Sequence, residues 1–376
     1  NNMKIPKKYK IVLESIGENA QKNKIKGWVV GGAVRDWYLK IDTQDIDITV
    51  QGDALKLAKF CQTKFGATIT KFDKFGTFRA DFKNGMKLDF VRARKETYKE
   101  PAVLPKVSAS NITDDLFRRD FSCNTWALSI LPASFGGKTA SFGESCDPFF
   151  ARKSIDKKQI KILHDKSFQD DPTRIFRALR FAGRFNWKLE KSTEKLLISA
   201  VKKGYLQYLS KKRVATELLK ILQEKEIKRI FKLLEKYKVS KFLHHEFKFS
   251  KAIMQVKCEY NKACVIACGF KVGGEEFLRD LQLPREYFNE MFGAYKLHKH
   301  KKSSLVELTS CQKEILKAFN PKLSATALKK CLLNGEDAKK LGLKGKQISQ
   351  AQEKICKLQW RGKIKTKTQA INYLRK

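Results

Sequence analysis

Two aspartates separated by a single residue are the first feature of this sequence that could do chemistry. Asp45 and Asp47 alternate with Ile46 and Ile48 in the run DIDITV. Side chains two positions apart project from the same face of a strand, so the two carboxylates would lie side by side while the isoleucines enter the core. Two carboxylates this close repel each other unless a cation lies near them. Oxygen ligands of this kind suit Mg²⁺, which keeps part of its shell for water and nucleotide phosphates.

Two further features of the same region fit phosphate chemistry. Gly31 and Gly32 follow the apolar run WVV, and a segment without Cβ atoms lets backbone amides approach a triphosphate. Asp89 is a third acid, surrounded by apolar neighbours in the run KLDFV. Three carboxylates on adjacent strands could hold two Mg²⁺ ions, one activating a terminal 3′ hydroxyl and one steadying the leaving pyrophosphate. A solvated strand edge and a simple turn are the alternative interpretations.

The charge balance of the chain favours a polyanionic partner. The sequence of 376 residues has 79 lysines and arginines against 39 aspartates and glutamates, a formal net charge of +40. This excess raises affinity for phosphates of any sequence, although an anionic membrane or a lysine-biased proteome would fit it too. No GxGxxG or GxxxxGK[ST] pattern is present, which argues against dinucleotide and P-loop proteins.

The apolar segments and the cysteines of the sequence indicate the cellular location of the protein. No stretch approaches the roughly 20 apolar residues that cross a bilayer, and no signal-peptide pattern opens the sequence. The nine cysteines, an odd number, fit reduced thiols better than a disulfide framework. We therefore expect a cytoplasmic protein.

The pattern of the chain changes near Phe150. Before it, short β-type runs dominate from Gly27 to about Leu131, with one helix expected over 54–65. After it, long amphipathic periods predict helices. The sequence therefore predicts an α+β head over 1–150, an all-helical neck over 151–240 and a helical body and tail over 241–376. The segment 92–107, with two prolines and mixed charges, is expected to lack regular structure.

Four separated motifs carry a family resemblance. GGAVRD (31–36), DIDI (45–48), RRDFSCN (118–124) and DDPTRIFRALRF (170–181) together resemble the class II CCA-adding enzyme and bacterial poly(A) polymerase family over roughly the first 220 residues. The resemblance implies a small nucleotidyltransferase-type sheet of five strands, mainly antiparallel or mixed. It assigns metal binding to Asp45 and Asp47, with Asp89 as a third catalytic acid. It assigns nucleotide binding, including recognition of the ribose, to Gly31, Gly32, Arg35, Asp36, Arg119, Asp120 and Asn124.

The last motif could choose the base. Pro172 suits the first position of a helix, which leaves Asp171 near its cap and Arg174 three residues later on the same face. Cytosine and adenine both present an amino donor beside a ring-nitrogen acceptor, so a carboxylate with a guanidinium complements them and opposes uracil and guanine. The family resemblance gives Asp171 and Arg174 the same roles. Arg177 is expected to contact triphosphate or RNA. An N-cap with a surface ion pair is the alternative.

The family resemblance implies addition of C, C and A from CTP and ATP to the 3′ end of tRNA, with two Mg²⁺ ions and release of pyrophosphate. The segment 92–107 resembles a flexible loop that members adding only CC tend to lack. Addition of A alone and poly(A) synthesis stay open, as do an RNA-binding protein on the same scaffold and transfer of AMP to a protein. The lysine-rich helical C-terminal half is expected to follow the tRNA acceptor stem electrostatically. No protein partner is evident.

Overall fold

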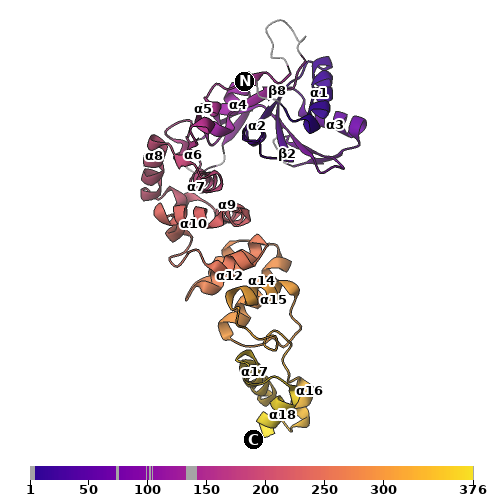
Figure 1. Cartoon of the computed structure of the whole chain (residues 1–376), viewed down its shortest axis with the longest axis vertical. Coiled ribbons are helices and arrows are strands. Elements are labelled where there is room, and N and C mark those ends of the chain that lie inside the picture. The colour runs from indigo at the N-terminus through magenta and orange to yellow at the C-terminus, as the bar shows by residue number, and fades with distance from the viewer. Residues whose placement is uncertain are drawn as a thin grey trace. The chain divides into compact units, whose positions relative to one another are not determined.

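The computed structural model describes residues 5–72, 76–98, 100, 103, 105–132 and 142–375. The chain divides into two compact units, Asn1–Tyr208 and Leu209–Lys376. The first unit, indigo to magenta in Figure 1, contains the β-sheets, whereas the described residues of the second form helices joined by loops.

A seven-stranded mixed sheet forms the frame of the first unit. Its strand order is β3-β4-β5-β2-β1-β8-β9. The β2–β5 pair is parallel, whereas every other neighbouring pair is antiparallel. The strands are β1 (Lys26–Val30), β2 (Asp45–Gln51), β3 (Thr68–Lys71), β4 (Phe78–Asp81), β5 (Lys87–Arg92), β8 (Ala127–Ser129) and β9 (Ser145–Cys146).

The β-type runs predicted before residue 92 are confirmed as the strands β1 to β5, and the helix predicted over 54–65 is α3 (Ala54–Phe65). The family resemblance implied a sheet of five strands, and this number is wrong. The sheet has seven strands, because β8 and β9 extend it beyond β1. β8 is a fully buried stretch of three residues and β9 has only two, too short for an alternating pattern to be visible in the sequence.

The register of β2 and β5 places the acids. Asp47 lies opposite Asp89, and Asp45 lies opposite Lys87. Asp45 and Asp47 are exposed, whereas Ile46 and Ile48 are buried, as the alternation predicted.

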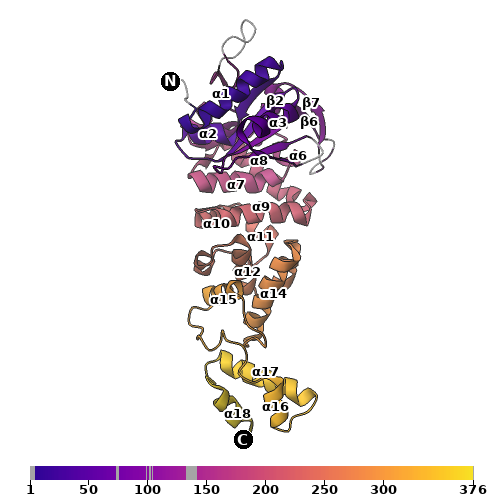
Figure 2. The ribbon, with the colours of Figure 1, turned by 90° about the vertical axis from the view of Figure 1, so that its right-hand side faces the viewer.

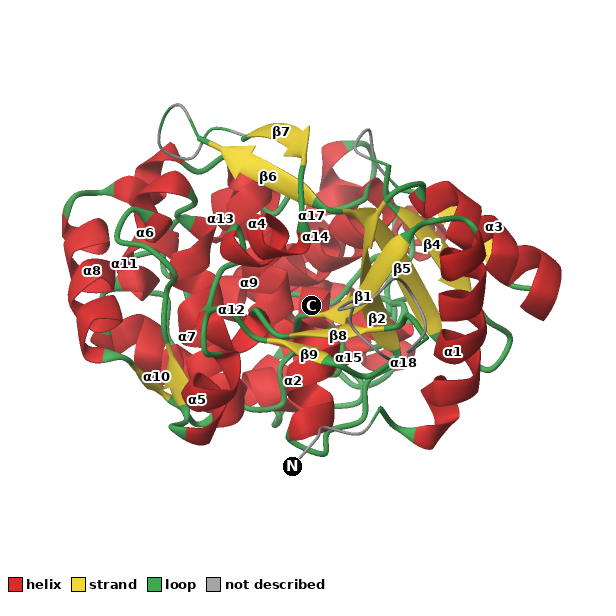
Figure 3. Ribbon diagram, turned by 90° about the horizontal axis from the view of Figure 1, so that it is seen from above, coloured by secondary structure: helices red, strands yellow, loops and turns green. Residues whose placement is uncertain are grey.

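Helices cover this sheet and continue the first unit. α1 and α3 pack against each other, α1 also contacts β1, and α3 contacts β4 and β5. Figures 2 and 3 show both helices beside the strands. Leu13 of α1 and Leu57 of α3 have no exposed surface. The helices of this unit are α1 (Lys7–Lys22), α2 (Gly32–Tyr38), α3, α4 (Ile112–Phe117), η1 (Ser122–Asn124), α5 (Ala151–Asp156), α6 (Ser167–Asp170), α7 (Thr173–Phe185), α8 (Lys191–Lys202) and η2 (Tyr205–Tyr208).

The first unit also has two small two-stranded sheets. β10 (Gln159–Ile160) pairs with β11 (Lys188–Leu189) in parallel. β6 (Arg94–Thr97) pairs with β7 (Lys106–Ala109) antiparallel, and Figure 3 shows this hairpin apart from the main sheet. The expectation that 92–107 lacks regular structure is therefore wrong at both ends of the segment. Residues 99, 101, 102 and 104, between the two strands, lie outside the described residues.

The second unit is built from helix packing. α12, α14 and α15 contact one another around the buried Cys264 and Cys268, and a separate core nearer the C-terminus includes Leu333 and Ile355. No helix in the described part of the chain is long and apolar enough to span a membrane. The helices are α9 (Lys211–Gln223), α10 (Ile227–Lys236), α11 (Val239–Leu243), η3 (Lys251–Gln255), α12 (Glu259–Gly269), α13 (Gly274–Asp280), α14 (Arg285–His300), α15 (Ser310–Phe319), α16 (Gly335–Lys340), α17 (Lys346–Trp360) and α18 (Lys367–Arg375).

Candidate active site

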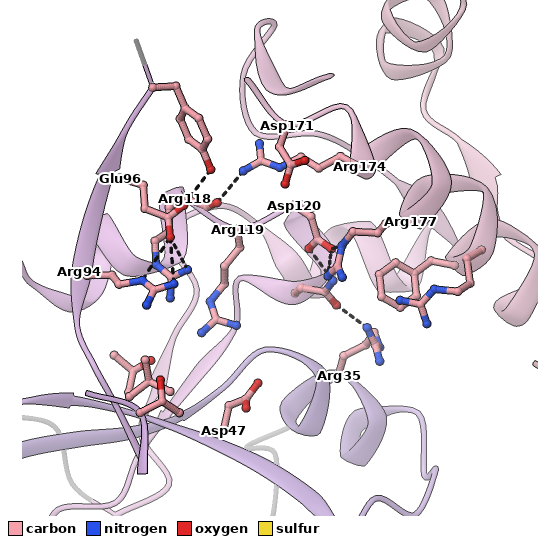
Figure 4. Close-up of a pocket in the computed structure, with 18 of the residues that line it drawn as sticks. Arg35, Asp47, Arg94, Glu96, Arg118, Arg119, Asp120, Asp171, Arg174 and Arg177 are labelled. Carbon is pink, nitrogen blue, oxygen red and sulfur yellow. Dashed lines mark hydrogen bonds and ion pairs between the residues drawn. The ribbon is translucent and has the colours of Figure 1, made fainter. Parts of the chain in front are cut away.

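A cavity of about 600 Å³ in the first unit gathers side chains from α2, β2, β6, α7 and the turn after α4. Its charged lining contains twice as many arginines as acids, so its electrostatic field favours a polyanion such as a triphosphate. Figure 4 shows these side chains converging on one space. The charged residues are Arg35, Arg94, Arg118, Arg119, Arg174, Arg177, Arg180 and Arg184, with Asp47, Glu96, Asp120 and Asp171.

Of the three acids expected to be catalytic, Asp47 lines the cavity. The carboxylate of Asp47 is exposed to water on one side and surrounded by protein on the others. This partial burial raises the pKa of Asp47, the positive charge of Arg119 lowers it, and the negative charge of Asp89 raises it. Asp45 projects from the same face of β2. Among the described residues, neither Asp45 nor Asp47 forms a side-chain hydrogen bond or ion pair, so the oxygens of both carboxylates are available as metal ligands.

Asp89 has a different environment. Its Oδ1 and Oδ2 accept hydrogen bonds of 2.7 Å each from Nε and Nη2 of Arg79, the residue opposite it on β4. A bidentate pair of this kind orients both groups and neutralises the carboxylate. The hydrogen bond to Asp89 raises the pKa of Arg79 further.

The three acids of the sheet do not form a closed cluster of metal-ligating atoms. Within the described residues, three metal-ligating side chains with ligand atoms within 4.8 Å of one another occur only at His244, His245 and Glu246, in the second unit. The three acids do not converge to that extent. Asp45 and Asp47 fit Mg²⁺ as a pair of oxygen donors, because this ion commonly fills its other positions with water and phosphate oxygens.

The glycine pair lies between β1 and α2. Gly31 has φ +71° and ψ −126°, a conformation that residues with a Cβ atom rarely adopt. A Cβ atom there would come closer than 3.0 Å to Nη1 of Arg119. Gly31 therefore lets the Arg119 guanidinium lie directly against the main chain, and Gly32 begins α2 beside it.

Arg35 joins this turn to the RRDFSCN motif. Its side chain is buried, and its Nε donates to Oδ1 of Asp36 at 2.8 Å while its Nη1 donates to Oδ1 of Asn124. The Phe185 ring lies beneath the guanidinium, 4.7 Å away from ring centroid to Cζ. The first motif and Asn124 are thus brought together through a contact between residues 89 positions apart.

Asp120 is the centre of a buried network. Its Oδ1 accepts from Nδ2 of Asn124 at 2.9 Å, and its Oδ2 accepts from Nε and Nη2 of Arg177 at 2.8 and 2.5 Å. Burial alone would raise the pKa of Asp120, but Arg177 and Asn124 lower it to about 2. Arg177 lines the cavity, and it also serves as the counter-charge of Asp120.

Two acids in the site were missed by the sequence interpretation. Asp115 has no exposed surface, and its carboxylate accepts from Arg118 at 2.8 and 2.9 Å and from Arg119 at 3.2 Å. Burial would raise its pKa, but the two arginines hold it below the usual range. Its position three and four residues before two arginines was the available signal. Glu96 of β6 accepts from Nη1 of Arg118 at 3.2 Å and from the Tyr98 hydroxyl at 2.9 Å.

The residues expected to read the base lie at the start of α7. Asp171 Oδ1 accepts from the backbone N–H of Thr173 at 3.0 Å and from its hydroxyl at 2.6 Å. Arg174 is buried, with Nη2 donating to the carbonyl oxygen of Arg118 at 2.9 Å. Both residues line the cavity that Asp47 enters from the sheet (Figure 4).

Two family models match the chain. Residues 27–160 match the poly(A) polymerase head domain, and residues 186–250 match the model described as "Probable RNA and SrmB-binding site of polymerase A". The chain belongs to the class II CCA-adding enzyme and bacterial poly(A) polymerase family.

Relatives with three named activities are similar to this chain. An A-adding tRNA nucleotidyltransferase of Aquifex aeolicus is 31% identical over 376 residues, covering 88% of this chain and 44% of its own length. A CCA-adding enzyme of Listeria monocytogenes serotype 4b is 30% identical over 230 residues, 58% of this chain and 52% of its own. A CC-adding enzyme of Deinococcus radiodurans is 31% identical over 156 residues, 42% and 40% respectively. This chain thus spans about half, or less, of the length of the curated relatives it matches.

Solved structures of CCA-adding enzymes resemble the whole chain. An apo form has a TM-score of 0.72 at 27% identity and covers 99% of this chain and 96% of its own. A complex with CTP has a TM-score of 0.69 at 28% identity, with coverage of 99% and 96%. The Thermotoga maritima enzyme complexed with tRNA has a TM-score of 0.65 at 25% identity, also with coverage of 99% and 96%.

Proposed function

We propose that this protein adds C, C and A to the 3′ end of tRNA from CTP and ATP, without a nucleic-acid template and with release of pyrophosphate. The observation that carries the proposal is that Asp47 and the pair Asp171–Arg174 line one cavity. A nucleotide bound there can extend its triphosphate towards the acids of β2 while its base meets the start of α7.

Different residues of the cavity would bind the phosphates, the ribose and the metal ions. Arg119, held by Asp115 beside Gly31, is placed to bind phosphate oxygens next to the acids. Asp120 and Asn124, fixed by Arg177 and Arg35, would present polar groups to the ribose hydroxyls. Mg²⁺ held by Asp45 and Asp47 would activate the 3′ hydroxyl and neutralise charge on the triphosphate, as two ions do in related chemistry.

Base selection would occur at the opposite end of the nucleotide. The Asp171 carboxylate would accept a hydrogen bond from the amino group of cytosine or adenine, and the Arg174 guanidinium would donate to the adjacent ring nitrogen. Uracil and guanine would bring a carbonyl towards the carboxylate and an N–H towards the guanidinium. Both contacts would be unpaired in a buried site, which is the situation in which discrimination is large.

Addition of A alone is the second candidate, favoured by the A-adding relative whose similarity covers 88% of this chain. The β6–β7 hairpin occupies the segment that resembles the flexible loop, which argues against addition of CC alone and leaves full CCA addition and addition of A alone open. For the functional regions we propose nucleotidyl transfer in 1–150, base recognition in 151–240 and tRNA contact in 241–376.

The test is incorporation of labelled CTP and ATP, separately and together, into tRNAs that end before CCA, after the first C and after CC, with Mg²⁺. We expect C, C and A to be added and synthesis then to stop. Incorporation of ATP only after CC would replace this proposal with the A-adding activity, and long A tails would indicate a poly(A) polymerase. No incorporation by the unmodified chain would refute nucleotidyl transfer.

Two variants give this test its control. Asp47→Asn should abolish incorporation because it removes a carboxylate from the cavity. Asp156→Asn removes a half-exposed carboxylate of α5 that lies outside the cavity lining and should leave incorporation intact. Equal loss in both variants would contradict the role of Asp47.

A further inference from the structure

Ser167 lies buried beneath both residues assigned to base recognition. It is the first residue of α6 and has no exposed surface. Its Oγ accepts a hydrogen bond of 2.7 Å from Nη1 of Arg174. Its carbonyl oxygen accepts one of 3.2 Å from the backbone N–H of Asp171. One small residue therefore supports both members of the pair that faces the base.

The contacts on Arg174 fix the plane of its guanidinium. Nη1 donates to the Ser167 hydroxyl and Nη2 donates to the carbonyl oxygen of Arg118, so each terminal nitrogen has its own acceptor. A guanidinium is planar and its five N–H donors have fixed directions relative to one another. With two of those donors held, the directions of the other three are set as well.

The Asp171 side of the pair is held in the same way. The N–H of Asp171 is bonded to Ser167, and its carboxylate is bonded to the backbone and hydroxyl of Thr173. The backbone N–H of Arg174 donates to the carbonyl oxygen of Asp171 at 3.0 Å. Among the described residues, the Arg174 side chain donates to two acceptors, the main-chain oxygen of Arg118 and the hydroxyl of Ser167, and of these the Ser167 hydroxyl is the one that substitution can remove.

We propose that Ser167 is a positioning residue for base selection, an inference that rests on the proposed nucleotidyl transfer. Its hydroxyl holds the Arg174 guanidinium in the one orientation that donates to the ring nitrogen of cytosine or adenine. Discrimination depends on opposed hydrogen-bond directions, and a guanidinium that is free to turn penalises uracil and guanine less. Ser167 does not touch the nucleotide in this scheme.

The experiment measures kcat/KM for ATP and GTP on a tRNA ending in CC, and for CTP and UTP on a tRNA ending before CCA. In Ser167→Ala we expect the preference for A over G, and for C over U, to fall about ten-fold, the scale of one hydrogen bond to a charged group. Ser167→Cys fills the same space with a weak acceptor and should give a similar fall without a cavity. Ser167→Thr keeps the hydroxyl and should restore the preference.

A matched control is available in the same unit. Ser154 is buried, its hydroxyl is 2.7 Å from that of Ser122, and it is not among the residues that line the cavity. Ser154→Ala therefore removes a buried hydroxyl at a comparable cost in stability and should leave the base preference unchanged.

A double variant separates positioning from a general structural effect. If Ser167 acts through Arg174, then Ser167→Ala introduced into Arg174→Ala should change the base preference no further. Additive effects would overturn the proposal, as would an unchanged preference in Ser167→Ala and Ser167→Cys while the unmodified chain still selects C and A. Failure of the unmodified chain to incorporate either nucleotide would instead refute the proposed function and this inference with it.

Discussion

Replacement of Gly31 by alanine tests the turn that joins the sheet to the cavity. At φ +71° and ψ −126° an alanine would occupy backbone space open almost only to glycine, at a cost of about 1–3 kcal/mol. Its Cβ would also force the end of Arg119 to move, which weakens the hydrogen bond of Arg119 to Asp115 by about 1 kcal/mol. We therefore expect Gly31→Ala to lower the free energy of unfolding by about 2–4 kcal/mol.

The assay is urea unfolding followed by tryptophan fluorescence, together with nucleotide incorporation under conditions where the variant is folded. Four of the five tryptophans lie in the first unit, at positions 28, 37, 126 and 187, so this signal reports mainly on that unit. Folded Gly31→Ala should also lose most of its activity, because the substitution displaces Arg119, which we propose binds phosphate oxygens.

A second glycine of positive φ provides the control for that assay. Gly66 ends α3 at φ +66° and ψ 26°, and a Cβ atom there would meet nothing within 4 Å. Gly66→Ala should cost only about 1–2 kcal/mol and leave the folded protein fully active. If the two variants lose equal stability and equal activity, the reasoning about Arg119 is refuted.

Three further outcomes are expected. Asp47→Asn should lower incorporation more than about 100-fold while tRNA affinity, measured by filter binding, stays unchanged; retained turnover would remove Asp47 from the catalytic group. Against burial, Arg177 lowers the pKa of Asp120 from 3.8 to about 2, so this carboxylate stabilises the fold above pH 4 and loses that effect as the pH falls towards 2. Asp120→Asn should therefore cost about 2 kcal/mol at pH 7 and progressively less below pH 4 in urea unfolding, and a pH-independent difference would contradict this. Arg79→Met leaves Asp89 without its partner and should lower unfolding stability by about 1–3 kcal/mol, measured in the same way.

The strands could be predicted where their side chains alternate. Ile46 and Ile48 are buried and Asp45 and Asp47 exposed, so period two in the sequence was sufficient to give the face on which the acids lie. The alternation could not predict that Asp89 lies opposite Asp47. It depends on parallel pairing of β2 and β5 across a long connection, which no local pattern specifies.

The β6 strand shows why the prediction of irregular structure over 92–107 is wrong. Its residues Arg94 and Glu96 share a face, and they are held by an ion pair and by Arg118 instead of by apolar burial. A strand stabilised by charge has no hydrophobic period to recognise. The pairing of Asp120 with Arg177 was equally hidden, because 57 residues separate them and each alone resembles an exposed surface charge.

The contacts of Arg118 bear on how the proposed activity could change over evolution. Its side chain bonds Glu96 on the hairpin, whereas its contact with Arg174 is made by a carbonyl oxygen that every amino acid possesses. Mutation at this position can therefore remove the ion pair with Glu96 of the hairpin without removing the carbonyl acceptor that helps to orient Arg174. In the proposed scheme, a substitution of Arg118 can alter the contribution of the hairpin while the orientation of Arg174, and with it the choice of base, is retained.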